Sequence, residues 1–236
     1  MSEKSLADVL EECTVRCRNM DAPLADRLRT FADEVRALNP EFADVVERMI
    51  ARLKTAGVGE DAPKPGEPMP EFLLPDESGR LTSLSALTGR GPVAVSFHRG
   101  HWCPYCQINA SALTSIHDEV KALGGDIVAI TPEAARFNAG LKAGARARFP
   151  VLSDMDNAYA LELDLAFYVG DEKQQFMKAS GWDIAPYQGS QQWMLPVPAT
   201  FVIGQDGIVA ARFIDPDYRT RMDTGAIVDA VRHART

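Results

Sequence analysis

A Cys-x-x-Cys motif between an apolar strand and a helix is the feature that most restricts the fold of this 236-residue chain. Val93–Phe97 forms an apolar run, and Cys103-Pro104-Tyr105-Cys106 follows five residues later, where a helical pattern begins. Such a run is typical of a central strand covered on both faces. Pro104 suits the first helical turn, where no N–H is needed. The sequence therefore predicts a β/α unit with its cysteines at the carboxyl edge of a sheet, where open α/β folds place their sites.

This placement of the two cysteines indicates redox chemistry. The free N–H groups and the positive dipole end of a helix stabilise an anion, and here the anion is a thiolate. Cys-x-x-Cys at a helix start lowers the thiol pKa from ~8.5 by about one to five units. We expect Cys103 to be the exposed, attacking thiol and Cys106, one helical turn further on, to form a disulfide with it.

Two other interpretations of the pair are half of a zinc site and a buried packing pair. A zinc site needs a second pair of Cys or His ligands at similar spacing. Cys13 and Cys17 are spaced differently, and no two histidines form an H-x3–5-H pair. The strand–helix context favours the redox interpretation. No metal, nucleotide or flavin motif is visible, so we expect no cofactor and no metal site.

Bulk properties exclude several partners. The formal charge is −8 and the pI is about 5.1, which argues against a nucleic-acid or anionic-membrane partner because either calls for a basic face. No apolar run approaches the ~20 residues that a membrane span needs. The polar start of the chain is not typical of a secretory signal. Four cysteines without such a signal fit reduced thiols, and we expect a cytoplasmic protein.

We expect three parts: a helical extension at 1–57, a Pro/Gly-rich linker at 58–70 and an α/β domain at 71–236. The extension shows three amphipathic stripes with helical spacing, with Asp21 and Asn39 as expected caps of the second and third helices. Because three short helices bury little alone, we expect them to dock on the α/β domain or on a second subunit. A homodimer is our expectation.

Cys13 and Cys17 lie four residues apart on the first predicted helix. Their Cβ atoms would be about 6 Å apart, too far for an unstrained mutual disulfide. They are either packing residues or, for one of them, a resolving thiol for Cys103.

Beyond the cysteines the chain alternates strands with helices and closes with a hairpin and a helix. This order predicts a mixed central sheet flanked by helices. Residues 164–196 lack a period and are rich in aromatics, so they are either a functional segment or lid, or an insertion without a role. The expected elements are a helix ending at Gly124-Gly125, a strand at 127–130, a helix capped by Thr131, an edge strand at 149–152, a helix at 153–163, a hairpin around Asp206-Gly207 and a helix from Arg221 to His233.

Four segments carry a resemblance to a known family: 66–75, 97–106, 195–203 and the Asp206-Gly207 turn. With them, residues 66–233 resemble the alkyl hydroperoxide reductase/thiol-specific antioxidant (peroxiredoxin-like) family of the thioredoxin superfamily. The resemblance implies a thioredoxin-like fold in which Cys103 attacks and Pro198 is a cis-proline facing it. From the residues alone, Pro198 is equally a trans proline that opens an edge strand.

Two positions depart from the family pattern. Its members place a threonine where this chain has Gly100 and an arginine where it has Val197, and those groups bind the peroxide and stabilise its leaving oxygen. Arg99 is either a replacement cation or a solvated surface residue. His98 and His101 either assist the thiolate if charged or are structural. As residues supporting the two cysteines we name Arg99, His101, Trp102, Pro104, Tyr105 and Pro198.

Three functions compete. In the first, a thiol peroxidase, Cys103 becomes a sulfenic acid, condenses with Cys106 and is reset by an external thioredoxin- or glutathione-linked thiol. In the second, a thiol–disulfide oxidoreductase, Cys103 forms a mixed disulfide with its substrate. The third is a redox sensor without turnover. The family resemblance favours the peroxidase, whereas Cys-Pro-Tyr-Cys is similar to the glutaredoxin motif and favours exchange. Of the three functions, we expect the peroxidase.

Overall fold

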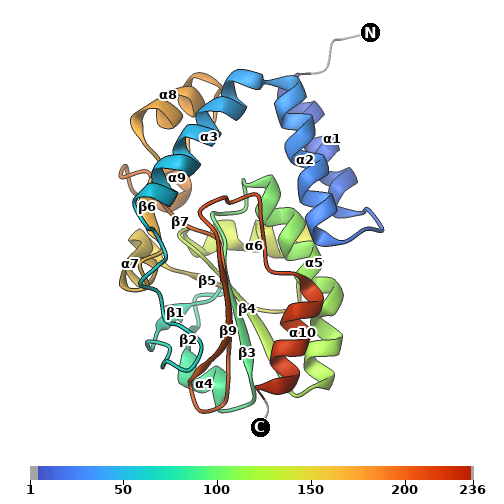
Figure 1. Ribbon diagram of the computed structural model, residues 1–236, viewed down its shortest axis with the longest axis vertical. Coiled ribbons are helices and arrows are strands. Elements are labelled where there is room, and N and C mark those ends of the chain that lie inside the picture. The colour runs from blue at the N-terminus through green and yellow to red at the C-terminus, as the bar shows by residue number, and fades with distance from the viewer. Residues whose placement is uncertain (1–4, 235–236) are drawn as a thin grey trace.

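A five-stranded mixed sheet forms the centre of the molecule (Figure 1). The computed structural model describes residues 5–234. Strand β3 (Val93–Phe97) is buried at every residue and lies in the middle of the strand order β5-β4-β3-β8-β9. It pairs in parallel with β4 (Asp126–Thr131) and antiparallel with β8 (Ala199–Ile203). The edges are β5 (Val151–Ser153) and β9 (Val209–Ile214), so the apolar run and the predicted edge strand are both confirmed.

Helices cover both faces of this sheet, because side chains that alternate along β3 and β4 enter two separate hydrophobic clusters. On one face pack the helices α5 (Pro104–Ala122), α6 (Ala135–Ala145) and α10 (Thr224–His233). The mixed α/β layering predicted from the element order is confirmed. On the other face lie α4 (Leu84–Thr88), α7 (Ala158–Glu162) with the short helix η1 (Met155–Asn157), and the hairpin β1 (Leu73–Pro75) and β2 (Leu81–Ser83).

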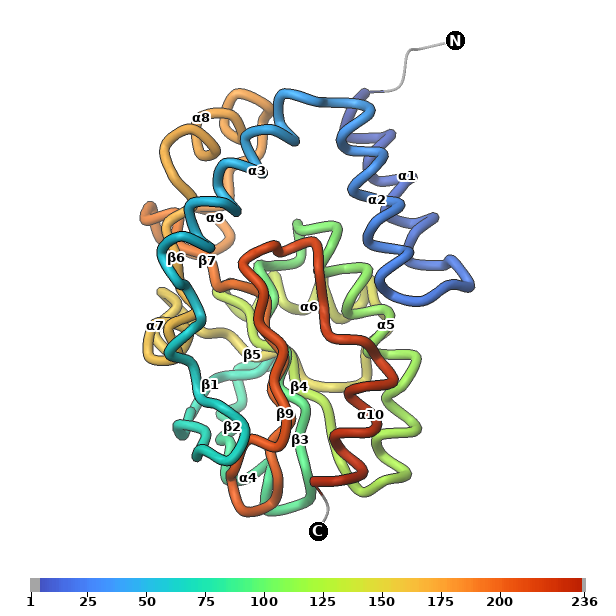
Figure 2. The backbone as a smooth tube through the Cα atoms, in the orientation of Figure 1, coloured from blue at the N-terminus to red at the C-terminus, as the bar shows by residue number. Residues whose placement is uncertain are grey.

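The N-terminal extension forms three helices, as predicted: α1 (Leu6–Arg18), α2 (Leu24–Leu38) and α3 (Pro40–Thr55). Helices α1 and α2 lie side by side against α5, whereas α3 crosses to α8 (Asp171–Ala179) (Figures 1 and 2). The expectation that these helices dock on the α/β body is therefore confirmed.

The expected helix caps agree only in part with the structure. Asn39 caps α3, since its Oδ1 accepts a hydrogen bond from the N–H of Phe42 at 3.0 Å. Asp21 does not cap α2, because that helix begins after Pro23 and no side chain caps it. Thr131 does not cap α6 either: its Oγ1 accepts from the Glu133 N–H, and α6 begins four residues later, at Ala135. A cap depends on the residue at which the helix begins and on the backbone conformation there, and the hydrophobic pattern predicts neither.

Residues 58–70 are fixed to the sheet. The N–H of Gly66 donates to the carbonyl of Val209 at 2.8 Å, and that of Met69 donates to the carbonyl of Gly207 at 3.0 Å. Ala62 is fully buried. The segment therefore attaches the helical extension rigidly to β9, and the division of the chain into 1–57, 58–70 and 71–236 stays a prediction.

The segment 164–196 is structured and faces the N-terminal helices. Two short strands, β6 (Ala166–Tyr168) and β7 (Met194–Pro196), pair antiparallel and enclose α8 and α9 (Ala185–Gln188). Its Trp193 is completely buried in the same cluster as the two cysteines of the motif. Short elements of this kind escape periodicity analysis because each is under three helical turns or three residues long. Within residues 5–234, no helix is long and apolar enough to cross a membrane.

The variant Phe31→Ala tests how much the packing of the N-terminal helices on the α/β domain stabilises the protein. Phe31 is 2% exposed and meets Tyr105 edge-on, with ring centroids 5.0 Å apart. We expect Phe31→Ala to lower the free energy of unfolding by about 3–5 kcal/mol, because it empties a packed site. Leu38→Ala on the same helix is the control: Leu38 is 40% exposed, so its change should stay within about 0.5 kcal/mol. Urea unfolding followed by circular dichroism measures both, and equal losses would contradict this packing.

Candidate active site

The motif lies where the sequence places it. After β3, the chain turns through residues 98–102. Cys103 is then the N-cap residue of α5, with an extended backbone (φ −88°, ψ 114°). Pro104 is the first residue of the helix, and Cys106 follows within its first turn. Both cysteines are free thiols. A thiolate on either therefore lies close to the unpaired N–H groups of a helix start.

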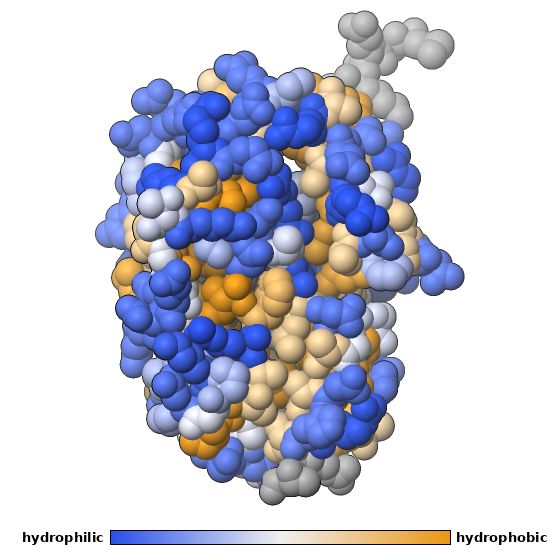
Figure 3. Space-filling model, viewed as in Figure 1, coloured by the Kyte–Doolittle hydropathy of each residue, from blue (hydrophilic) through white to orange (hydrophobic). Residues whose placement is uncertain are grey.

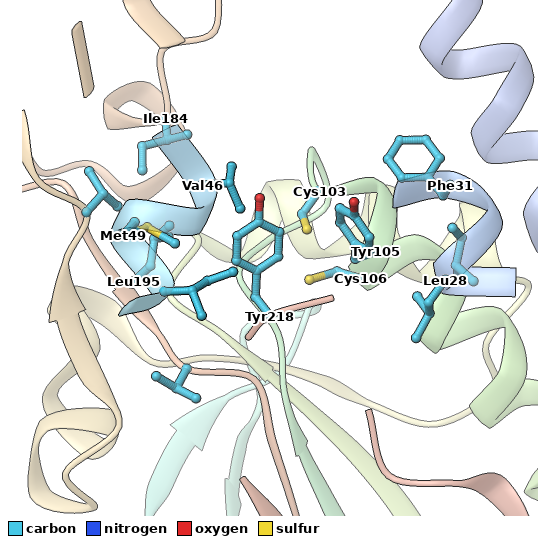
Figure 4. Packing of buried hydrophobic residues seen from close by; sticks show 14 of the residues in the cluster. Leu28, Phe31, Val46, Met49, Cys103, Tyr105, Cys106, Ile184, Leu195 and Tyr218 are labelled. Atoms are coloured by element: carbon cyan, nitrogen blue, oxygen red, sulfur yellow. The ribbon is translucent and has the colours of Figure 1, made fainter. Parts of the chain in front are cut away.

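The expected exposure of Cys103 is wrong. Cys103 and Cys106 are both 0% exposed. Figure 4 shows their sulfur atoms between the rings of Tyr105 and Tyr218, with Phe31 of α2 beyond Tyr105. The cover comes from α2 and from the segment before α10, which are far from the motif in sequence, so the motif itself carries no sign of it.

Two guanidinium groups face the buried sulfurs. Nη2 of Arg99 donates to Cys103 Sγ at 3.1 Å, and the Arg99 backbone N–H donates to Cys106 Sγ at 3.3 Å. Nη2 of Arg221 lies 3.7 Å from Cys106 Sγ. Arg99 is 3% exposed, so it is a cation at the sulfur and not a solvated surface residue. No sequence pattern pointed to Arg221 as a site residue; it was expected in the last helix, but it precedes α10.

The pKa values of the two thiols are shifted in opposite directions. Burial alone would raise the pKa of Cys106, but a hydrogen bond from Cys103 and the guanidiniums of Arg221 and Arg99 outweigh it and lower that pKa to about 5. Burial, together with the hydrogen bond to Cys106, raises the pKa of Cys103 well above its usual value. The pair therefore shares a single negative charge, with one remaining proton between the sulfurs.

Aromatic rings hold the Arg99 guanidinium in place. Its Cζ lies 3.4 Å from the ring centroid of Tyr218 and 5.4 Å from that of Trp102. Tyr218 in turn meets Tyr105 edge-on at 5.3 Å. A cation over an aromatic face is stabilised by the ring quadrupole. Trp102 and Tyr105, which were predicted as supporting residues, thus lie around the cation–sulfur contact.

The two neighbouring histidines have different partners. Burial, followed by the charge of Arg221, lowers the pKa of His98 to about 3, so this ring is neutral, and its Nε2 lies 3.1 Å from Ser96 Oγ. His98 is therefore structural. His101 pairs with the fully buried Glu133, whose carboxylate oxygens lie 2.6 Å from the His101 backbone N and 2.8 Å from its Nδ1. Glu133 was not predicted, because it comes from the loop after β4.

The surroundings of Gly100 leave no room for the threonine of the family pattern. Its φ is +138°, and a Cβ atom there would lie 2.5 Å from Trp102 Nε1 and 2.7 Å from the Glu133 carboxyl carbon. Both distances are shorter than the contacts that real Cβ atoms form. The Glu133 carboxylate and the Trp102 indole thus occupy the space that a threonine side chain would need.

The cis-proline prediction is wrong. No cis peptide bond occurs among residues 5–234, so the bond before Pro198 is trans. Pro198 precedes β8, which is an inner strand and not an edge. Val197 is fully buried in the cluster that contains Cys103 and Cys106, so an apolar side chain stands where the family has an arginine.

Cys13 and Cys17 are buried on α1, with their sulfur atoms 3.9 Å apart. Burial, followed by the neighbouring Cys17, raises the pKa of Cys13 to about 12. A thiol held protonated in this way is a poor nucleophile, which favours the packing interpretation. Within the part of the chain that the structure describes, no group of three or more His, Cys, Asp or Glu could hold a metal ion.

A cavity of about 520 Å³ lies above the motif, between α1–α2 and the α8–α9 segment. Arg99, Trp102 and Tyr218 line it on the side of the cysteines, and Lys173 and Trp182 line it from the segment 164–196. Figure 3 shows apolar residues gathered in the recess on this side of the molecule. The site therefore adjoins a space for a ligand larger than hydrogen peroxide.

Gly100→Ala tests the crowded turn. We expect it to lower the free energy of unfolding by more than about 1–3 kcal/mol, because a strained φ and two close contacts act together. Gly79→Ala is the matched control: Gly79 also has a positive φ (+84°), but nothing lies within 4 Å of the added atom. Thermal unfolding compares the two variants, and equal losses would show that Trp102 and Glu133 do not exclude a side chain here.

Comparisons with known proteins agree with this arrangement. The model of the AhpC/TSA family matches residues 65–212. A Mycobacterium tuberculosis (strain H37Rv) protein assigned as a peroxiredoxin is 30% identical over 150 residues, which cover 63% of this chain and 84% of that protein. The chloroplastic peroxiredoxin Q of Oryza sativa subsp. japonica is 33% identical over 92 residues, 39% of this chain. The chain spans only 42% of that plant relative.

Solved structures show the same fold. The peroxidoxin BcpB of Mycobacterium tuberculosis superposes with a TM-score of 0.57 at 22% identity, over 74% of this chain and 99% of that one. A peroxiredoxin 6 mutant of Arenicola marina gives a TM-score of 0.55 at 15% identity, over 71% of each chain. Since the family match covers more than half of the sequence, the resemblance and the thioredoxin-like fold are confirmed, and the chain belongs to the AhpC/TSA family.

Proposed function

We propose that the protein is a thiol-dependent antioxidant oxidoreductase that reduces hydroperoxides through Cys103 and Cys106. The observation that carries the proposal is the pair of guanidinium groups at the buried sulfurs, with Arg99 at 3.1 Å from Cys103 and Arg221 at 3.7 Å from Cys106. Fixed cations in a buried site stabilise both the thiolate and the negative charge that develops on a departing oxygen. Membership of a family whose relatives are named peroxiredoxins supports the same activity.

The first step begins with the shared proton. When it moves from Cys103 to Cys106, Cys103 becomes the thiolate, held by Arg99. The Cys103 sulfur then attacks the terminal oxygen of R–O–OH, an S–O bond forms and the O–O bond breaks. The sulfur loses two electrons and becomes a sulfenic acid, and the departing RO⁻ gains them, takes the proton held by Cys106 and leaves as ROH. Arg99 lies where this charge develops.

The second step uses Cys106. The Cys106 thiolate left by the first step attacks the Cys103 sulfenic acid, an S–S bond forms, the S–O bond breaks, and the departing hydroxide takes a proton from solvent to become water. Two electrons from an external thiol reductant, thioredoxin- or glutathione-linked, then restore both thiols by thiol–disulfide exchange. Cys106 is the proposed resolving residue, because it lies within the same helical turn, whereas Cys13 and Cys17 are on α1.

Thiol–disulfide exchange without significant peroxidase activity is the second candidate. The Cys-Pro-Tyr-Cys sequence at a helix start and the absence of a hydroxyl at Gly100 favour it. A redox sensor would show oxidation without turnover. The acidic composition argues against nucleic-acid and anionic-membrane partners, and the free cysteines favour the cytoplasm. A homodimer is also part of the proposal, and it rests on the apolar stripes of the N-terminal helices.

The Cys106→Ser variant tests which sulfur attacks. We expect reduced Cys106→Ser to form a sulfenic acid on Cys103 at least about 100-fold faster than a free thiolate, because Arg99 stabilises the leaving oxygen. Trapping of the sulfenic acid followed by mass spectrometry measures the rate. Cys103→Ser should form none, and Cys13→Ser should react as the unchanged protein does. A rate equal to that of a free thiolate would leave exchange as the function.

The Arg99→Met variant tests the cation. Removing the guanidinium should slow peroxide oxidation of the cysteines by about 10²–10³-fold, the usual effect of losing one charge-stabilising donor. Arg90→Met is the control, because Arg90 is an exposed arginine. Stopped-flow tryptophan fluorescence after mixing with hydrogen peroxide gives both rates. Equal rates for the two variants would contradict the role of Arg99.

A further inference from the structure

The two cysteines are enclosed, yet their chemistry takes up protons from outside. Under the proposed function each turnover needs one proton for the hydroxide that leaves Cys103 and another to restore the shared proton when the disulfide is reduced. Both cysteines are 0% exposed and lie between aromatic rings (Figure 4). The protons therefore have to come through a group that contacts both the solvent and the cavity above the motif.

His101 meets that requirement. It lines the cavity, and its side chain is 28% exposed. Histidine is the side chain that gains and loses a proton near neutral pH. Lys173 lines the same cavity but is 2% exposed, so it lacks the contact with solvent through which it could regain a proton. Tyr105 and Tyr218 are poor proton donors, because burial raises the pKa of both.

A fully buried carboxylate holds the His101 ring. Glu133 is 0% exposed, and its two oxygens lie 2.6 Å from the His101 backbone N and 2.8 Å from its Nδ1. An ionised carboxylate only accepts hydrogen bonds, so Nδ1 is the donor to it. Within residues 5–234, His101 is the one basic group at ion-pair distance from Glu133. A buried carboxylate is costly unless it is paired, so the doubly protonated His101 ring is the natural counter-ion of Glu133.

Aromatic side chains fix the orientation of the same ring. Phe137 of α6 stacks on it with centroids 5.5 Å apart and 12° between the planes, and Tyr187 of α9 meets it edge-on at 4.9 Å. The charged and titratable groups packed around the ring are thus Glu133 and Tyr187, with Arg136 over the Phe137 ring at 4.6 Å. Because Nδ1 is held by Glu133, Nε2 is the atom left to exchange a proton.

The turn that carries His101 also carries the reacting sulfur. Cys103 lies two residues further on, and its N–H donates to the Gly100 carbonyl at 3.3 Å. The Gln107 side chain donates to the His101 carbonyl at 2.8 Å, which ties the turn to α5. Arg99, whose Nη2 is 3.1 Å from Cys103 Sγ, lines the cavity together with His101. A proton released by the His101 ring therefore enters the space that adjoins the cysteines.

We propose that His101 and Glu133 form a proton relay between solvent and the two cysteines, with His101 as the proton donor and Glu133 as the positioning residue that holds its ring. When Cys106 attacks the Cys103 sulfenic acid, the S–O bond breaks, and the departing hydroxide takes the Nε2 proton of the imidazolium to become water. The neutral ring then regains a proton from solvent. On reduction of the disulfide, the same relay restores the proton that the sulfurs share.

This inference rests on the proposed function and adds the source of its protons. The first step uses the proton held by Cys106, so the relay acts only after the sulfenic acid has formed. Disulfide formation and disulfide reduction are therefore the two steps that depend on His101.

The variant His101→Gln tests the relay, because its amide can still donate to Glu133 but has no proton to transfer. After mixing with hydrogen peroxide, sulfenic acid should form at an unchanged rate, whereas the disulfide should form about 10²-fold more slowly, the usual contribution of a proton donor. Trapping with dimedone followed by mass spectrometry should show that sulfenic acid accumulates. His117→Gln is the matched control and should keep both rates: His117 also pairs with a carboxylate, Asp126, at 2.9 Å, but does not line the cavity.

Chemical rescue distinguishes a proton donor from a structural support. His101→Ala removes the ring between Phe137 and Tyr187, so added imidazole can occupy its place. Imidazole should accelerate disulfide formation in this variant at least about tenfold and leave the unchanged protein as it is. Glu133→Gln keeps an acceptor for the His101 N–H but removes the charge, and it should slow the same step.

A measurement without peroxide separates the relay from the peroxidase function. The Cys103–Cys106 disulfide is formed with diamide and reduced with dithiothreitol, and the two sulfurs take up one proton as they accept two electrons. His101→Gln should slow this reduction about tenfold or more. If it does so although the unchanged protein forms no sulfenic acid, the peroxidase function fails and the relay stands. Disulfide formation and reduction at the rates of the unchanged protein in His101→Gln, or a His101→Ala variant insensitive to imidazole, would overturn the relay.

Discussion

The contact between the Arg99 guanidinium and the Cys103 sulfur is the interaction on which the rest of the site depends. An arginine cannot lose its proton in a protein, so a buried Arg99 needs an anion beside it. Burial lowers its pKa, but attraction by Cys103, Tyr218 and Cys106 together outweighs burial and raises it. The cysteine pair is the anion available. The same contact that makes Arg99 tolerable in the interior therefore keeps a negative charge on the sulfur pair.

Elements outside the central sheet make this contact possible. Helices α1 and α2 cover the start of α5, and Phe31 of α2 closes over Tyr105. Helix α3 lies against α8, which brings Lys173 to Tyr218. Without these elements the cysteines would face solvent, and water would weaken both the thiolate–guanidinium attraction and the charge stabilisation of a leaving oxygen. The helical extension thus belongs to the site as well as to the core.

Local features of the fold could be predicted from the sequence, and distant contacts could not. The run Val93–Phe97 predicts a buried strand because its composition suits only a strand covered on both faces, and the stripe of α3 predicts a helix for a similar reason. Pro104 at the first turn placed Cys103 correctly. The family resemblance gave the thioredoxin-like sheet but also an incorrect cis bond before Pro198. Short elements in 164–196 lie below the length at which periodicity is informative.

Among the site residues, too, those near the motif in sequence could be predicted and those from distant segments could not. Cys103, Cys106, Arg99 and Trp102 are neighbours in sequence, so the motif led to all of them. Arg221, Glu133 and Lys173 come from three separate loops and helices, and only packing brings them to the turn 98–103. Burial of Cys103 was missed for the same reason.

The most direct test of the account is a pH titration of the thiolate in the reduced protein, followed by its ultraviolet absorbance. One thiolate per chain should be present at neutral pH and should disappear as the pH falls through about 5, because the lowered pKa of Cys106 is set by its hydrogen bond from Cys103 and by the two guanidiniums. In Arg99→Met the midpoint should rise. A midpoint near the ordinary thiol pKa of ~8.5 in the unchanged protein would show that the arginines do not hold a thiolate, and would contradict the account.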